Sequence, residues 1–198
     1  MSNLENYENF LDFIMPVIDR KFEHQKEYLS CSKGCALCCK NVNMPFSQLE
    51  FDYLIEGFNN LDNNQKQLVL QKIKSQLENS ENPECPFLQN EICSVYKYRG
   101  IICRTFGLLL VNGDNEYTVP FCVHKGLNYS EIFDEETQQL SAEKREALGY
   151  ENDPMFYSLS RQQLFGLQIA KELELNPGES KTLIEWLREF YNNYSNKR

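Results

Sequence analysis

The sequence lacks the long hydrophobic runs that would place a chain in a membrane. No window approaches the ~18 consecutive apolar residues that a membrane-spanning helix needs. The opening stretch MSNLENYENFLDF has no basic start, no uninterrupted apolar core and no small-residue cleavage site, so it does not resemble a secretory signal. We therefore expect a cytoplasmic protein whose eight cysteines stay reduced instead of forming four disulfides.

Positive charge is also scarce. Lysine and arginine together number 20 against 29 aspartates and glutamates, which gives a formal net charge of -9. Nucleic acids and anionic membrane surfaces attract clustered Lys and Arg. We therefore expect neither nucleic acid nor membrane as a partner, which leaves a protein or small-molecule partner of unknown identity.

The motifs of common enzyme classes are missing or incomplete. The stretch NPGESKT, residues 176–182, has Ser180 where a phosphate-binding loop needs a glycine before the lysine, so we interpret it as a helix cap. No βαβ pattern surrounds Cys35 and Cys38, as a thioredoxin-like pair requires. No hydrolase motif supports a Ser-His-Asp site. For a cysteine nucleophile the chain offers only two histidines: His24, expected on a helix surface, and His124, either a solvated loop residue or a metal-site residue.

Apolar residues recur at helical spacing at both ends of the chain. We predict a helix over 3–29 that Pro16 kinks or splits, and another from the capping box Ser47–Glu50 to Phe58. Further helices are predicted after Asp62 to Leu77, from Asp153-Pro154 to Leu173, and from a Ser180 cap to Tyr191. The aromatic residues of the terminal helices pack a core or line a substrate cleft; they are Phe10, Phe22, Trp186, Phe190 and Tyr191.

The middle of the chain, 83–125, shows a different pattern. Turn residues between apolar pairs predict two small hairpins, one over 87–96 and one over 108–119. The fold class we expect is mostly α: a single helical domain over 1–198, with irregular cysteine-rich loops and one or two small β-hairpins.

All eight cysteines fall in two places. The stretch CSKGCALCC holds Cys31, Cys35, Cys38 and Cys39, and the middle region holds Cys85, Cys93, Cys103 and Cys122. Cysteines that merely fill a core would be scattered among the apolar helix positions. Their clustering therefore indicates a metal site.

Thiolates are soft ligands that suit zinc, copper(I) and iron–sulfur clusters. Cys35 and Cys38 can converge on one centre, because Gly34 permits a tight turn before them. The side chains of the neighbours Cys38 and Cys39 are expected to diverge. They would then serve different metals, or one of them would support the site without binding metal. Four cysteines fit zinc and a 4Fe-4S cluster equally well by count.

The spacing Cys31-x-x-x-Cys35-x-x-Cys38 is also found in radical S-adenosylmethionine enzymes. Those enzymes resemble partial α/β barrels and usually have an aromatic residue before the third cysteine. Here Leu37 occupies that position, and helices follow helices. This chemistry is therefore not our expectation.

The combined cysteine pattern resembles the YkgJ-type cysteine-cluster family, described as a zinc- or iron-chelating domain and often as an iron–sulfur oxidoreductase. After CSKGCALCC, the resemblance rests on Cys85-Pro86-Phe87-Leu88, Cys93-Ser94-Val95-Tyr96 and Cys103-Arg104-Thr105-Phe106, and it covers about residues 31–125. One departure is Arg99-Gly100, where the family usually has Arg-Pro; the glycine is expected to loosen that loop without loss of a ligand. The same cluster occurs in a bacterial flagellin lysine methylase, so the resemblance implies a possible iron–sulfur oxidoreductase or protein-modifying enzyme. No S-adenosylmethionine-binding glycine-rich loop is present.

We expect a single main metal centre and assign no catalytic residue. The predicted ligands that match both spacing and family pattern are Cys35, Cys38, Cys39, Cys85, Cys93 and Cys103, and Cys31 and Cys122 complete the set. Arg99 and Arg104 either offset thiolate charge or are ordinary surface or carboxylate-paired residues. The leading function is iron–sulfur cluster binding for electron transfer or protein modification. The alternative is a structural or regulatory zinc protein without catalysis.

Overall fold

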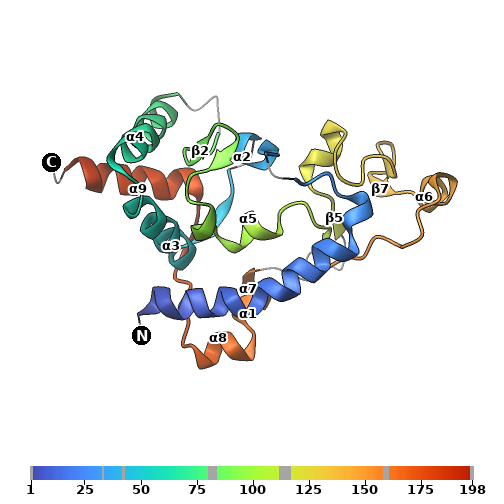
Figure 1. Cartoon of the computed structure of the whole chain (residues 1–198), viewed down its shortest axis with the longest axis horizontal. Coiled ribbons are helices and arrows are strands. Elements are labelled where there is room, and N and C mark those ends of the chain that lie inside the picture. The colour runs from blue at the N-terminus through green and yellow to red at the C-terminus, as the bar shows by residue number, and fades with distance from the viewer. Residues whose placement is uncertain are drawn as a thin grey trace. The chain divides into compact units, whose positions relative to one another are not determined.

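The structure is a computed structural model that describes residues 2–32, 34–41, 43–79, 84–111, 117–157 and 161–196 (Figure 1). Helices dominate these residues, and the strands form small two-stranded sheets, so the predicted mostly α fold is confirmed. The chain divides into two compact units. Unit 1 comprises Met1–Glu8, Lys33–Arg104 and Glu172–Arg198, and unit 2 comprises Asn9–Ser32 and Thr105–Lys171. The single domain over 1–198 stays a prediction.

Unit 1 contains most of the longer helices. Its elements are α2 (Leu37–Asn41), β1 (Pro45–Ser47), α3 (Gln48–Asn59), α4 (Asn63–Glu78), β2 (Leu88–Gln89), β3 (Ile92–Cys93), η2 (Tyr96–Tyr98), β8 (Ser180–Thr182) and α9 (Leu183–Ser195). The helix α5 (Ile101–Thr105) lies in it up to Arg104. Figure 1 shows α3, α4 and α9 as neighbours, and contacts join α4 to α9.

Aromatic packing joins the first and last parts of unit 1. The rings of Phe51 on α3 and Trp186 on α9 stack with centroids 5.3 Å apart. The Trp186 Nε1–H donates a hydrogen bond to the Phe46 carbonyl at 3.0 Å. Trp186 is buried, and the rings of Phe190 and Phe58 meet edge to face. These α9 aromatics therefore belong to the core of unit 1.

A short sheet absent from the sequence-based prediction ties α3 to α9. Strand β1 pairs antiparallel with β8, with Phe46 opposite Lys181. The predicted Ser180 cap is wrong, because Ser180 begins β8 and Thr182 forms the capping box of α9 with Glu185. The Thr182-x-x-Glu185 signal was visible in the sequence, whereas the third residue after Ser180 is Leu183, which cannot complete a capping box.

Unit 2 has its own apolar core. Its elements are η1 (Lys26–Tyr28), β4 (Leu110–Val111), β5 (Tyr117–Thr118), η3 (Phe121–Lys125), β6 (Phe133–Asp134), β7 (Gln139–Leu140), α6 (Ala142–Leu148), α7 (Arg161–Phe165) and most of α8 (Gln168–Glu172). Tyr28 stacks on Tyr129, and both pack with Leu109, Ile132 and Phe133. The backbone N–H of Tyr129 also donates to the Tyr28 carbonyl at 2.8 Å.

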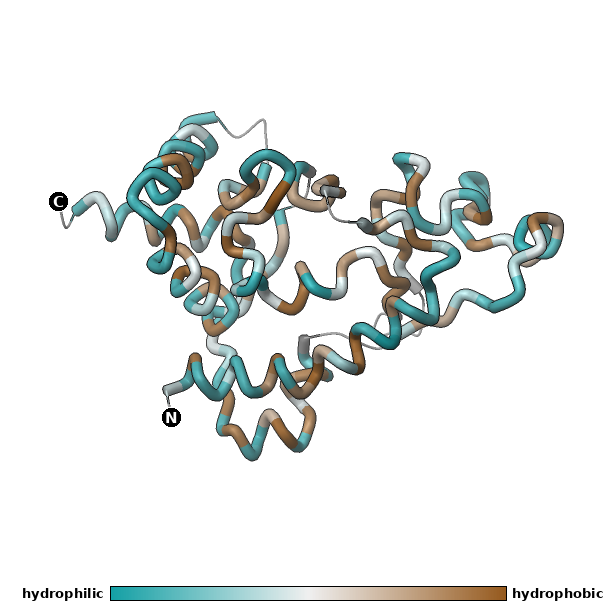
Figure 2. Tube along the Cα trace, viewed as in Figure 1, coloured by the Kyte–Doolittle hydropathy of each residue, from teal (hydrophilic) through white to brown (hydrophobic). Residues whose placement is uncertain are grey.

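The first helix, α1 (Asn3–His24), begins in unit 1 and continues in unit 2. It runs through Pro16, so the predicted split does not occur. Proline removes one helical donor. The carbonyl that loses it is that of Asp12, an exposed residue, where water can replace the bond. Figure 2 shows hydrophobic residues recurring between hydrophilic ones along α1.

The long helix predicted from Asp153 to Leu173 is wrong. Residues 153–156 are not helical, and Tyr157 forms a parallel bridge with Leu110. Two short helices, α7 and α8, follow, with Gly166 between them. Glycine weakens a helix interior, which explains the break within an otherwise periodic segment. Residues 158–160 of that prediction lie outside the described residues.

Both predicted hairpins are present as sheets. Strand β2 pairs with β3 and β4 pairs with β5, while the turn 112–116 of the second hairpin lies outside the described residues. A third hairpin, β6 with β7, has no clear sequence signal. None of the helices within the described residues has the length and hydrophobicity that a membrane crossing requires.

Candidate metal centre

Six of the eight cysteines belong to unit 1. They are Cys35, Cys38, Cys39, Cys85, Cys93 and Cys103, whereas Cys31 and Cys122 belong to unit 2. Several lie on short helical segments instead of loops: Cys38 and Cys39 on α2, Cys103 on α5 and Cys122 on η3. Segments of five residues are too short to show helical periodicity, so the sequence could not reveal them.

The thiols of Cys38 and Cys39 point together. Their Sγ atoms lie 4.0 Å apart, so the predicted divergence of these side chains is wrong. Successive helical residues point in different directions at Cβ, but rotation about χ1 brings the two sulfurs to the same side. A tetrahedral zinc with Zn–S bonds of about 2.3 Å separates its sulfurs by about 3.8 Å. The pair can therefore serve one metal.

The backbone joins this pair to the second cysteine region. The N–H of Cys85 donates a hydrogen bond to the Cys39 carbonyl at 2.6 Å. The Cys85 carbonyl in turn accepts from the N–H of Leu88 at 3.0 Å, at the start of the β2–β3 hairpin. Cysteines 46 positions apart in the sequence thus meet within unit 1.

The hairpin positions Cys93. Cys93 on β3 is paired with Leu88 on β2, and the turn residues Asn90 and Glu91 have φ of 49° and 62°. These left-handed values are those of a tight two-residue hairpin turn. The register of the hairpin therefore sets which side of the sheet the Cys93 thiol occupies.

Gly100 permits close packing before α5, the helix that carries Cys103. A Cβ at this position would lie 2.8 Å from Cε1 of Phe46. Gly100 is buried, so the glycine allows a tight contact instead of loosening the loop as expected. In this chain the proline of Arg-Pro would bring a Cβ too close to the Phe46 ring.

The thiols of unit 1 influence one another's ionisation. Burial raises the pKa of Cys103 to about 12, with a further contribution from Cys93. Burial, followed by the charge of Cys103, raises the pKa of Cys85, and a hydrogen bond with Cys39, followed by burial, raises that of Cys38. Burial also raises the pKa of Cys93. Without a cation these thiols hold their protons at neutral pH, and a bound metal would displace them.

Arg99 is the cation that acts on these thiols. Its charge lowers the pKa of both Cys93 and Cys103, in opposition to burial. The guanidinium lies 3.6 Å from the ring centre of Tyr96, and its Nη1 donates to the Cys103 carbonyl at 3.4 Å. Arg104 directs its Nε to the Arg99 carbonyl at 2.8 Å and another nitrogen to the Lys97 carbonyl. Arg104 therefore braces the loop that presents Arg99.

Cys31 has a different environment in unit 2. The Nδ2 of the buried Asn128 donates to the Cys31 Sγ at 3.2 Å and to the Gly107 carbonyl at 3.2 Å. Its Oδ1 accepts from the backbone N–H of Ser30 at 2.8 Å, which fixes the amide orientation. Gly107 has φ of 107°, and a Cβ there would lie 2.8 Å from the Cys31 Sγ. Cys122 is buried on η3.

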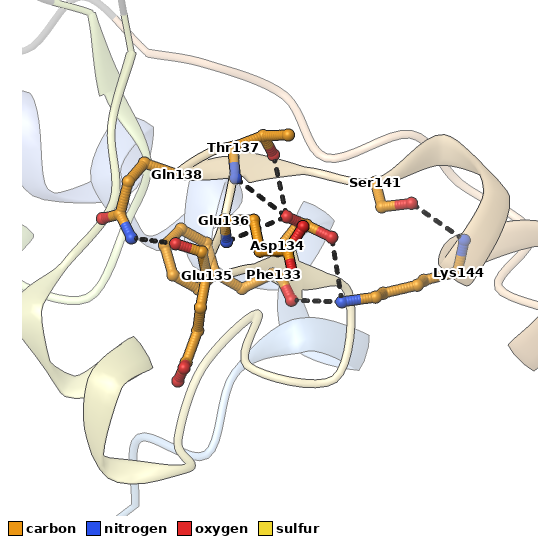
Figure 3. Close-up of polar contacts among 8 residues, drawn as sticks. All are labelled: Phe133, Asp134, Glu135, Glu136, Thr137, Gln138, Ser141 and Lys144. Carbon is orange, nitrogen blue, oxygen red and sulfur yellow. Dashed lines mark hydrogen bonds and ion pairs between the residues drawn. The ribbon is translucent and has the colours of Figure 1, made fainter.

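A hollow of about 630 Å³ in unit 2 has an acidic lining without cysteine. In Figure 3, one oxygen of Asp134 accepts from the N–H groups of Glu136 and Thr137, at 3.1 and 2.9 Å, and its other oxygen faces Lys144. The pKa of Asp134 is lowered, first by the backbone bond from Thr137. His124 lines the same hollow and meets Phe133 edge to face. Asp134 thus organises the β6–β7 turn and Lys144.

In the residues that the structure describes, no three Cys, His, Asp or Glu side chains surround a common metal position. The donor chemistry of unit 1 nevertheless fits a thiophilic metal. It offers partly buried sulfurs, one pair at a suitable separation, and a cationic neighbour. The ligand set, including Cys31 and Cys122, stays a prediction.

One family model matches the chain, over residues 30–123. It is named CxxCxxCC and described as a "Putative zinc- or iron-chelating domain". Residues 30–123 are thus a cysteine-cluster domain of this family, which confirms the predicted family, and the match supports metal binding. No curated protein and no solved structure matches the chain.

Proposed function

We propose that unit 1 holds one metal centre and that this centre is an iron–sulfur cluster used for electron transfer or protein modification. The observation that carries the proposal is the backbone bond between Cys85 and Cys39, which brings the two cysteine regions together. The residues that would hold the cluster are Cys38, Cys39, Cys85, Cys93 and Cys103, with Cys35 from the preceding loop. When bound, such a cluster supplies one-electron transfer.

The number of thiols does not distinguish a cluster from a zinc site, because each takes four cysteines and unit 1 offers six. The cation beside the thiols is the observation that suits a redox centre. Arg99 adds positive charge beside Cys93 and Cys103, which offsets the charge of a thiolate-ligated cluster. Charge and hydrogen bonding around the sulfurs are the means by which a protein sets a cluster's potential.

Structural or regulatory zinc is the second candidate. It is favoured by the 4.0 Å separation of the Cys38 and Cys39 sulfurs, which is close to the edge of a zinc–thiolate tetrahedron. In this case the centre would hold the two cysteine regions together and carry out no reaction.

Purification without oxygen followed by metal analysis distinguishes the two candidates. A brown protein with iron, acid-labile sulfide and visible sulfur-to-iron absorbance supports the cluster. A colourless protein with one zinc per chain supports the alternative. A chain that takes up neither metal, either as purified or after reconstitution, contradicts both.

A further inference from the structure

Glu50 on α3 is a carboxylate buried inside unit 1. Its exposed fraction is 0 %. Burying a carboxylate is costly unless hydrogen bonds replace the lost water. One oxygen, Oε2, accepts from the backbone N–H of Ser47 at 2.9 Å and from the Ser47 hydroxyl at 2.8 Å. This is the capping box that begins α3.

The second oxygen reaches a different helix. Oε1 of Glu50 accepts from the backbone N–H of Ile101 at 2.9 Å, although the two residues are 51 positions apart. Ile101 is the first residue of α5, and N–H groups in the first turn have no acceptor within their own helix. One side chain therefore satisfies the starts of both α3 and α5.

This arrangement fixes α5 tightly. A Cβ added to Gly100, the residue before Ile101, would lie 3.1 Å from Glu50 Oε1 and 2.8 Å from the Phe46 ring. Phe46 is itself only 1 % exposed, so its ring has little freedom to move away from Gly100. Cys103 follows Ile101 by two residues on the same short helix. The position of its thiol therefore depends on where Glu50 holds the start of α5.

We propose that Glu50 is a positioning residue for the metal centre of unit 1, because it anchors the helix that presents Cys103. The inference rests on the proposed function, since it requires Cys103 to be a ligand. Groups that hydrogen-bond a metal ligand typically cost about 10–100-fold in metal affinity when lost. Glu50 acts one step further out, through the backbone of the helix that carries Cys103. The carboxylate connects the centre to the folded core through β1 and α3.

Two probes are used: cobalt(II), whose thiolate absorbance reports ligand number and geometry at a zinc-type site, and iron with sulfide, whose visible absorbance after reconstitution reports a cluster. Three variants separate positioning from stability. Glu50→Gln keeps the size of the side chain, but its amide cannot accept from both Ser47 and Ile101. Ser47→Ala breaks the cap of α3 and leaves the bond to Ile101. Glu56→Gln changes an exposed glutamate on the same helix and is the matched control.

We expect Glu50→Gln to weaken cobalt binding about 10-fold or more and to change the cobalt–thiolate spectrum. Ser47→Ala should lower the melting temperature of the metal-free chain yet keep the wild-type spectrum. Glu56→Gln should change neither. A Glu50→Gln variant with wild-type affinity and spectrum overturns the inference, whereas a wild-type chain that takes up neither cobalt nor, after reconstitution, an iron–sulfur cluster through its cysteines overturns the proposed function.

A measurement on the wild-type chain covers the case in which Glu50→Gln does not fold. Zinc replaces cobalt in this measurement because it is diamagnetic. Hydrogen exchange in the zinc-bound chain should show the Ile101 N–H strongly protected. An Ile101 amide that exchanges as fast as a free amide in the zinc-bound chain would overturn the inference without any substitution.

Discussion

The cysteines of the two units have different surroundings. In unit 1, partly buried thiols act on one another, and Cys38 and Cys39 share one side of α2. In unit 2, the Asn128 amide donates a hydrogen bond to the Cys31 thiol, and Cys122 is buried on η3. The family match over 30–123 includes residues of both units. A shared cysteine pattern therefore does not imply a shared role for each cysteine.

Removal of the metal should have the largest effect and should act first on unit 1. Metal binding by thiolates is folding free energy, about 10–16 kcal/mol for structural zinc in zinc-finger peptides. We expect strong chelators to lower the melting temperature and to release the Cys85 amide, which bonds to Cys39, to rapid hydrogen exchange. The Tyr129 amide, bonded to Tyr28 in unit 2, should stay protected longer. An unchanged melting temperature after complete removal of metal would contradict the proposed centre.

Single serine substitutions test which unit supplies the ligands. Cys85→Ser and Cys103→Ser should each lower the metal content per chain, because each removes a sulfur from unit 1. Cys31→Ser and Cys122→Ser are the matched comparison, and we expect them to retain more metal. Metal analysis of the purified variants provides the measurement.

Two results would change this picture. Full metal in both Cys85→Ser and Cys103→Ser would confine the site to the CSKGCALCC stretch. Equal losses from all four variants would mean that the cysteines of both units are required, and the contrast drawn from their surroundings would not extend to metal binding.

Local signals explain what the sequence predicted well. The capping boxes of Ser47 and Asp62 begin α3 and α4 as expected, because a cap depends on residues three positions apart. The cysteine clusters and the turn of the β2–β3 hairpin are local patterns too. The family followed from these patterns and is confirmed.

Long-range contacts explain what the sequence did not reveal. The β1–β8 sheet pairs residues 133 to 137 positions apart, and neither strand is longer than three residues. The Ser47–Glu50 signal predicted the helix cap but not the bond from Glu50 to Ile101. The Cys38–Cys39 approach depends on side-chain rotation, which residue spacing does not determine.

Replacing a glycine by alanine should give stability losses of intermediate size in both units. Gly100→Ala in unit 1 should destabilise the chain by about 1–3 kcal/mol, because the new Cβ would overlap the Phe46 ring. Gly107→Ala in unit 2 combines a Cβ 2.8 Å from the Cys31 Sγ with a φ of 107°. Its cost should be at least as large. Urea denaturation measures both effects.

The two glycine variants should also differ in their metal content. Gly100→Ala should also reduce metal content, since Gly100 directly precedes the helix of Cys103. Gly107→Ala should instead alter the rate at which Cys31 is alkylated, measured by mass spectrometry. Gly126→Ala is the control, because Gly126 has φ of 73° but open space around its Cβ position. Greater stability loss from Gly126→Ala than from either variant would contradict the steric argument.

Removing a helix cap should give the smallest stability losses, and these should still differ between the two units. Asp62 caps α4 in unit 1, where its Oδ1 accepts from the Gln65 N–H at 2.8 Å, and α4 buries Val69, Leu70 and Ile73. Asp62→Ala should therefore cost about 1 kcal/mol of unfolding free energy. Ser141 caps α6 in unit 2 through the Lys144 N–H at 3.1 Å, but α6 has no buried residue. A helix with no buried face can open by itself, so Ser141→Ala should speed amide exchange in α6 and leave the urea midpoint nearly unchanged. A larger midpoint shift for Ser141→Ala than for Asp62→Ala would show that α6 is part of the cooperative core of unit 2, and the packing contrast between these helices would be wrong.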